Sequence, residues 1–263
     1  IYVQTAGHYR VGVETGEVYA EDRVYVDAEN IRLCGGYGMR YDILVELANA
    51  GDSILLLANS YLAEDRVRTR EDDEYRQKLY RYHDVLRQCG FKVIKKYVKR
   101  FVDDEGVQTT KANADMDLAI DALLQARNLD RIILLTGDGD FLRLVLALQN
   151  MGCRVEVIGF RNVSNELREA ADSYLSGYLI PGLLPIQSDG GPRHRGVAIN
   201  YNQERGFGFM RYFTLSARGL RAESVFSIAR GTVRPTIRYL WRVVRFLSFP
   251  LSRPRKTRIV PRR

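Results

Sequence analysis

RIILLTGDGDF (residues 131–141) places an apolar run directly before two aspartates, Asp138 and Asp140. The run VYVD (24–27) ends on an acid in the same way, at Asp27. Between them, the helical stretch KANADMDLAIDALL carries Asp115 near its start. Because the carboxyl ends of parallel strands lie at the same edge of a sheet, we expect these acids to meet there.

The segments on either side of this stretch alternate between two hydrophobic patterns. Short apolar runs predict buried strands at 23–27, 53–60, 91–98, 131–136 and 154–160. Apolar residues at helical spacing predict helices at 38–51, 71–90, 115–128, 140–152 and 164–175. Residues 103–108 are expected to form a turn. Strands that alternate with helices favour an α/β fold, a parallel sheet with helices on both faces. The pattern leaves the order of the strands open.

Charge is distributed unevenly along the chain, which has 263 residues and a net charge of +8. Residues 1–190 hold 23 basic and 30 acidic side chains, a net of −7, whereas residues 191–263 hold 17 and 2, a net of +15. An acidic front and a basic back predict two units with different partners. The basic unit suits a polyanion such as nucleic acid or a membrane surface.

Composition and patterning divide the chain into five expected segments. They are an N-terminal extension (1–21), the α/β domain (22–178), a Pro- and Gly-rich linker (179–194), a small β module (195–232) and an arginine-rich tail (233–263). Two alternating runs around a turn predict a β-hairpin at 195–213. In the tail, residues 237–249 fit an amphipathic helix or strand, and residues 252–263 look disordered.

The expected cluster of aspartates points to a divalent cation. Like charges in one crevice repel one another unless a cation lies between them. Carboxylate oxygens suit Mg²⁺ or Mn²⁺, and such ions assist phosphodiester hydrolysis by acidifying a bound water and neutralising the phosphate. The predicted catalytic and metal-binding residues are Asp27, Asp115, Asp138 and Asp140, with Asn30, Thr136 and Asp121 in support.

The supporting residues have narrower expected roles. Asn30 would orient a water or a ligand carboxylate, and Thr136 would bind a phosphate oxygen or steady the site. Asp121 follows Asp115 by about 600° of helix at roughly 100° per residue, so the two side chains point well apart. Asp117 is displaced similarly, so at most one or two of these helix acids are expected to be direct ligands.

Each aspartate taken singly fits a structural role better than a catalytic one. An acid after a strand commonly caps a helix, the GDGD segment suits a tight turn, and a helix acid can simply be solvated. The delivery of acids by three separate segments to one edge is what favours a site.

Three segments resemble the motifs of the NYN domain and occur in the same order: VYVDAENI, KANADMDLAID and ILLTGDGDFLRLV. The resemblance is specifically to the LabA-like bacterial branch of this domain, within the PIN-like nuclease superfamily. The resemblance covers residues 22–176 and implies a Rossmann-like PIN fold, an acidic pocket and metal-dependent ribonuclease activity. The family's residues fall on Asp27, Asn30, Asp115, Asp121, Asp138 and Asp140. The family usually reads Lys-Gly-x-Asp before the middle aspartate, whereas here Lys111 is one position early, which weakens a phosphate-binding role for it.

The segment GVAINYNQERGFGFM (196–210) resembles the opening hairpin of a cold-shock domain, an OB-type barrel that binds single strands. Phe207 and Phe209 alternate on one strand face and can stack unpaired bases, and Tyr201 would add a third ring. Arg205 and Arg211 would contact phosphates.

The resemblance to a cold-shock domain is partial. Asn200 stands where that family usually has Trp. SVFSIA (224–229) resembles the second motif of the family only weakly and lacks its usual His. The aromatic side chains could equally form a small hydrophobic core. The arginine-rich remainder is either an RNA-binding tail or sequence that no longer encodes the rest of the barrel, for instance after a frameshift.

Other functional classes find little support in the sequence. Cys34, Cys89 and Cys153 form no CxxC pair and read as small buried side chains in a reducing cytoplasm, and the histidines match no zinc spacing. Without a long apolar run or a signal peptide, we expect a cytoplasmic protein with no membrane partner. The chain starts at Ile1 rather than Met, which leaves export open, and assembly into a homo-oligomer is open too.

These observations predict a metal-dependent ribonuclease with a C-terminal module that binds single-stranded RNA. One alternative is a non-catalytic RNA-binding regulator that keeps the acidic pocket. The other is a metal-dependent phosphatase acting on small molecules, which has no need of a basic, aromatic C-terminus.

Overall fold

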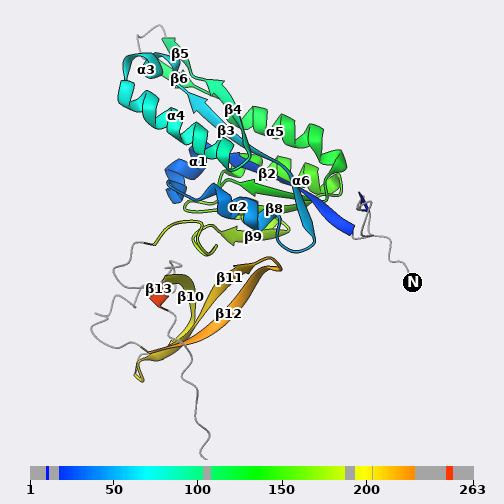
Figure 1. Cartoon of the computed structure of the whole chain (residues 1–263), viewed down its shortest axis with the longest axis vertical. Coiled ribbons are helices and arrows are strands. Elements are labelled where there is room, and N and C mark those ends of the chain that lie inside the picture. Colours follow the sequence, from blue (N-terminus) through cyan, green and yellow to red (C-terminus); the bar gives the residue numbers. More distant parts are fainter. Residues whose placement is uncertain are drawn as a thin grey trace, which may run out of the picture. The chain divides into compact units, whose positions relative to one another are not determined.

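The computed structural model describes residues 10–11, 18–102, 108–186, 193–202, 204–228 and 247–250 (Figure 1). These residues belong to two compact units: the first takes the chain up to Pro185 together with Leu215–Arg221, and the second takes the rest of the C-terminal strands. No helix among the described residues is both long and apolar enough to cross a membrane.

Six parallel strands form the centre of the first unit in the described part of the chain: β2 (Val18–Asp27), β3 (Ser53–Glu64), β4 (Phe91–Tyr97), β7 (Arg131–Leu135), β8 (Arg154–Gly159) and β9 (Ser173–Ser176). They are ordered β4-β3-β2-β7-β8-β9, and β1 (Arg10–Val11) pairs antiparallel with the start of β2. Counted along the chain, the parallel strands have the order 3-2-1-4-5-6 of Rossmann-type sheets. The predicted α/β fold with a central parallel sheet is therefore confirmed.

Helices connect the strands and cover the sheet: α1 (Ala28–Ile31), η1 (Arg32–Gly36), α2 (Tyr41–Ala48), α3 (Arg66–Glu71), α4 (Asp73–Gln88), α5 (Ala114–Gln125), η2 (Ala126–Asn128), η3 (Gly139–Phe141), α6 (Leu142–Asn150) and α7 (Asn165–Ala170). Around the expected turn, β5 (Lys99–Val102) and β6 (Gln108–Lys111) form a separate antiparallel pair.

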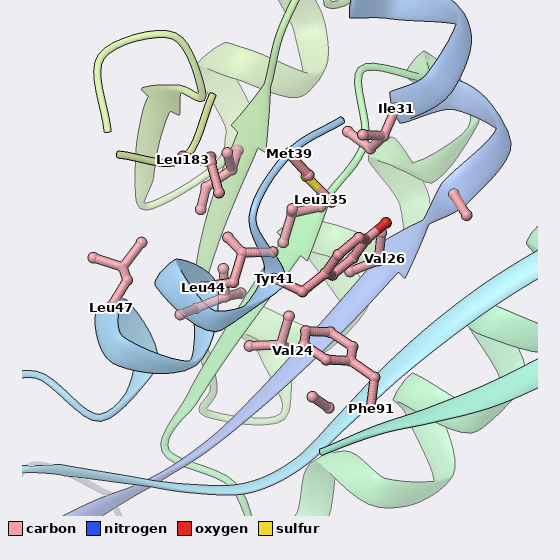
Figure 2. Close-up of a cluster of buried hydrophobic side chains, with 14 of the residues drawn as sticks. Val24, Val26, Ile31, Met39, Tyr41, Leu44, Leu47, Phe91, Leu135 and Leu183 are labelled. Carbon is pink, nitrogen blue, oxygen red and sulfur yellow. The ribbon is translucent and has the colours of Figure 1, made fainter. Parts of the chain in front are cut away.

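Alternate residues of each central strand feed hydrophobic clusters on opposite faces of the sheet. Val24 and Val26 lie in the cluster that contains Tyr41 and Leu44 of α2 (Figure 2). Tyr25, between them in β2, belongs to the other cluster, with Leu118 of α5, Leu148 of α6 and Leu167 of α7. Side chains on a strand alternate between the two faces, so one strand serves both cores.

The expected helix over 164–175 is wrong in its second half. Ser164 caps α7 as its sequence suggests, but the helix ends at Ala170 and residues 173–176 form β9. The Asp172 backbone N–H donates to Val155 O (3.0 Å), and the Asp172 carboxylate accepts from Val155 N (2.7 Å). These tertiary bonds to β8 override the local helical spacing and add a strand to the sheet.

The first part of the segment expected to be a linker, 179–194, is packed instead of free. Ile180, Leu183 and Leu184 are buried in the same cluster as α2, and Leu183 O accepts from Arg40 N (2.8 Å). The linker is predicted from the Pro and Gly content of this segment. Its apolar side chains are buried against the face of the sheet, and that burial holds the segment in place.

The described C-terminal strands form an antiparallel sheet in the order β12-β11-β10-β13, made of β10 (Arg193–Asn202), β11 (Phe207–Ser216), β12 (Gly219–Ile228) and β13 (Leu247–Pro250). The predicted hairpin is confirmed as β10 and β11. β13 pairs with the start of β10, so part of the segment expected to be a tail contributes a strand. The remainder of that tail, including 252–263, lies outside the described residues.

Candidate functional site

The strand order marks one place on the sheet edge as a binding position. β2 and β7 are neighbours, and the chain leaves β2 toward β3 but leaves β7 toward β8. In open α/β sheets, ligands bind outside the carboxyl ends of the strands at such a switch point. Asp27 is the last residue of β2, and Thr136 to Asp138 follow β7 directly.

Asp27 is a buried carboxylate held by hydrogen bonds on both of its oxygens. It caps α1, where Oδ1 accepts from Asn30 N (3.1 Å), and its Oδ2 accepts from the Thr136 hydroxyl (3.0 Å). Asp27 is only 5% exposed, and Thr136 is fully buried. The orientation of Asp27 is therefore fixed before any ligand arrives.

The loop after β7 is tied to the same group. Asn30 Oδ1 accepts from Gly137 N (2.9 Å), and Thr136 Oγ1 accepts from Asp138 N (3.1 Å). A Cβ at Gly137 would lie 3.3 Å from Val163 Cα and 3.4 Å from Asn30 Oδ1, so a side chain there would push the loop away. Asn30 and Thr136 thus link the ends of β2 and β7 into one frame.

The two acids of this loop differ in exposure. Asp138 caps η3, its Oδ1 accepting from Asp140 N (3.0 Å). Asp138 is half-buried, whereas Asp140 is exposed. Asp138 consequently lies closer to the interior of the site, and Asp140 lies at its rim.

Asp115, in the first turn of α5, lies close enough to Asp27 and Asp138 for their charges to interact. Burial raises the pKa of Asp27 to about 6, and the charges of Asp115 and Asp138 push that pKa in the same direction. Burial also raises the pKa of Asp115, with Asp138 and Asp140 adding to it. Carboxylates from β2, α5 and the loop after β7 therefore repel one another across this edge of the sheet.

Such a group of acids fits a hard divalent cation, since it offers carboxylate oxygens and an excess of negative charge that a cation relieves. Among the described residues, no group of three or more His, Cys, Asp or Glu side chains is gathered closely enough to enclose a metal ion. The acids interact electrostatically without forming a closed cage.

The other two acids of this helix, Asp117 and the predicted supporting residue Asp121, have partners away from this group. The Asp121 carboxylate accepts from the Tyr61 hydroxyl (2.8 Å), and Asp117 forms an ion pair with Lys96 (2.9 Å). Helical geometry anticipates this separation from Asp115. The Lys111 side chain lies outside the described residues.

Cys34 is a neighbour of the site that the sequence does not reveal. It lies half-buried in η1, and burial together with the charges of Asp27 and Asp138 raises the pKa of its thiol. The Cys34 carbonyl accepts from Arg161 N (2.9 Å), which brings η1 to the loop after β8. All three cysteines are free thiols, and of these Cys153 is buried as expected.

An aromatic group lies on the C-terminal sheet. The rings of Phe207 and Phe209 of β11 lie 5.4 and 5.5 Å from the ring of Phe226 in β12, and Phe209 and Phe226 are 42% and 50% exposed. Phe226 lies in SVFSIA, the weak match to the second cold-shock motif, and was not predicted from the sequence as a candidate for base stacking. Arg205 and Arg211 are exposed, while the side chain of Tyr201 lies outside the described residues.

Comparison with known proteins matches the acid-bearing unit. A relative, the Low amplitude and bright protein LabA of Synechococcus elongatus, is 31% identical over 97 residues, 36% of this chain. The matched region is 52% of that protein, so the chain spans about half the length of this relative. A crystal structure of a protein of unknown function from Vibrio parahaemolyticus is 27% identical and covers 60% of this chain and 93% of its own, with a TM-score of 0.48.

The sequence model of the NYN domain matches residues 23–183, more than half of the chain. The matched range contains the ends of β2 and β7 and the start of α5, and with them the acids of the site. This chain belongs to the NYN domain family.

Proposed function

We propose that this protein is a ribonuclease that hydrolyses RNA phosphodiester bonds with Mg²⁺ or Mn²⁺ as its cofactor. The feature that carries the proposal is the convergence of Asp27, Asp115 and Asp138 at the switch point of a Rossmann-type sheet, where burial and neighbouring acids raise the pKa of Asp27 and of Asp115. Such a group is stable when a cation lies among its members. Membership of the NYN family, which the motifs relate to PIN-like nucleases, supports the same chemistry.

The residues of the site divide the work by their positions. Asp27, Asp115 and Asp138 would hold the cation, with Asp140 reaching it from the rim. A divalent cation supplies charge neutralisation to the phosphate and acidity to a bound water. Asn30 and Thr136 fix the carboxylate of Asp27 and the loop that carries Asp138, so that the ligands need little rearrangement.

A single-stranded nucleic acid such as RNA suits the second unit better than a small substrate. Residues 191–263 carry a net charge of +15, and the exposed rings of Phe209 and Phe226 provide faces for unpaired bases. A small phosphorylated substrate would use neither feature.

The proposal is tested by Asp115→Asn, which removes one charge and keeps the size of the side chain. With single-stranded RNA and Mn²⁺, we expect cleavage to fall by about 100-fold or more, because the cation loses a ligand worth several kcal/mol in the transition state. Asp52→Asn is the matched control: Asp52 is exposed and immediately precedes β3, at the opposite edge of the sheet. Cleavage by Asp52→Asn should equal that of the wild type.

Equal cleavage by Asp115→Asn and the wild type would remove this acid from the site. Tight, salt-sensitive RNA binding by a wild-type protein that leaves RNA length unchanged would contradict the proposal in favour of a non-catalytic regulator. Turnover of a small phosphate ester without turnover of RNA would favour the phosphatase.

Phe209→Ala and Phe226→Ala are expected to weaken RNA binding. Each base stacked on an aromatic ring contributes about 1–3 kcal/mol, so the dissociation constant should rise by roughly 5- to 150-fold, with little change in cleavage at saturating RNA. Fluorescence anisotropy with labelled single-stranded RNA measures the effect. Ile199→Ala is the control, since Ile199 is also exposed on this sheet but has no ring; an equal loss in that variant would refute stacking.

A further inference from the structure

In the described structure, α5 is fastened to the sheet by polar contacts at regular spacing. Residues 117, 121 and 125 of the helix, four apart and so on one face, each accept from a side chain of a different strand: Asp117 from Lys96 of β4 (2.9 Å), Asp121 from Tyr61 of β3 (2.8 Å) and Gln125 from Tyr25 of β2 (2.9 Å). The contacts therefore run diagonally across neighbouring strands under one helix.

Of the three contacts, the hydrogen bond between Tyr61 and Asp121 is expected to contribute most to holding α5 on the sheet. Tyr61 is 1% exposed, and its hydroxyl also accepts from Asn59 Nδ2 (3.0 Å). The outer ion pair of Lys96 and Asp117 has side chains 39% and 31% exposed, where such pairs contribute little. Because Tyr61 is buried and Asp121 is half-buried, their charge-assisted hydrogen bond is screened less by water than the outer ion pair.

The position of Tyr61 connects this contact to the acid site. In the parallel pair of β2 and β3, Tyr61 is the direct partner of Asp27. Its hydroxyl reaches Asp121, which lies in the same helix as Asp115, about 9 Å further along the axis. One hydrogen bond thus joins the strand beside Asp27 to the helix that carries Asp115.

We propose that Tyr61 and Asp121 are positioning residues, whose partly buried hydrogen bond sets α5 on the sheet so that Asp115 lies opposite Asp27 and Asp138. This inference rests on the proposed function and assigns Asp121 a role other than that of a metal ligand. A misplacement of about 1 Å at a reacting centre can reduce a rate by up to roughly 100-fold, so a small tilt of α5 matters.

Two variants separate positioning from direct ligation. Asp121→Asn keeps an oxygen that accepts from Tyr61, so we expect Mn²⁺ affinity and kcat within about threefold of the wild type. Tyr61→Phe keeps the ring and removes the donor; we expect Mn²⁺ affinity and kcat to fall by about 3- to 10-fold, with KM for RNA unchanged. Backbone amide hydrogen exchange in α5 should rise in Tyr61→Phe.

Tyr82→Phe is the matched control. Its hydroxyl pairs with Tyr41 (2.6 Å), a member of the cluster on the other face of the sheet, so its loss should leave α5 exchange and Mn²⁺ affinity unchanged. Calorimetric titration with Mn²⁺ and hydrogen exchange are measured on the full chain without RNA, independently of cleavage.

The outcomes distinguish this inference from the proposed function. Loss of Mn²⁺ binding in Asp121→Asn to the level of Asp115→Asn would make Asp121 a ligand and overturn the inference. Wild-type exchange and Mn²⁺ affinity in Tyr61→Phe would overturn it as well. A wild-type protein that binds Mn²⁺ but cleaves no RNA would refute the ribonuclease alone, and one that binds no Mn²⁺ would refute both.

Discussion

Replacement of Asp27 by Asn is expected to lower RNA cleavage by at least about 100-fold and to stabilise the metal-free protein at pH 8. The loss of activity follows from the removal of a central ligand for the cation. The gain in stability follows from burial: a carboxylate that is 5% exposed, with Asp115 and Asp138 nearby, is costly to ionise. Function and stability therefore oppose each other at this residue.

The pH dependence has a definite sign. Folding raises the pKa of Asp27 from 3.8 to about 6, so between these values the folded state binds a proton that the unfolded state has released. Stability of the metal-free wild type should fall as pH rises from about 4 to about 6, by roughly 3 kcal/mol in total. Asp27→Asn removes this contribution, so the variant should be more stable at pH 8 and similar at pH 4.

Urea unfolding at pH 4 and pH 8 in the presence of a chelator, followed by circular dichroism, measures the difference. A variant that is less stable than the wild type at pH 8 would contradict the burial argument. A variant that cleaves RNA as fast as the wild type would contradict the assignment of Asp27 to the site.

Arg131→Ala is expected to destabilise the fold by about 3–5 kcal/mol, a large share of the stability of a typical domain. Asp22 is fully buried, and Arg131 Nε donates to its Oδ2 (2.8 Å). Arg131 Nη2 also donates to Ala48 O (3.0 Å). Truncation would leave a buried carboxylate and a carbonyl without these partners, and burial already raises the pKa of Asp22.

Denaturant unfolding compares this variant with Arg154→Ala. Arg154 is the partner of Arg131 in the neighbouring strand, but its ion pair with Glu156 is exposed, so its loss should cost less than about 1 kcal/mol. Adding Asp22→Asn to Arg131→Ala should recover part of the stability, since it removes the unpaired charge. Equal costs for the two single variants would show that the buried pair has no special role.

The place of each candidate acid on its own strand or helix was accessible to sequence reasoning, because it follows from local rules. Asp27 and Asp138 each follow an apolar strand, and parallel strands deliver their carboxyl ends to one edge. The angle between Asp115 and Asp121 on one helix is likewise a local property. Residue type and spacing were enough for these inferences.

Features that depend on tertiary contacts were not accessible. Strand β9 pairs with β8, and Asp172 just before it bonds to Val155, 17 residues earlier in the chain. Cys34 lies near the acids only because η1 follows β2 along this edge of the sheet. Tyr61 bonds to Asp121 only because α5 packs over β3. Hydrophobic periodicity carries no information about which strands are neighbours.

The most direct measurement is anomalous diffraction from crystals of the full chain soaked in Mn²⁺. The account predicts a manganese peak among the carboxylates of Asp27, Asp115 and Asp138 in the wild type, and its loss in Asp27→Asn. A peak elsewhere, or none at a Mn²⁺ concentration that supports RNA cleavage, would contradict a metal-dependent site at this edge of the sheet.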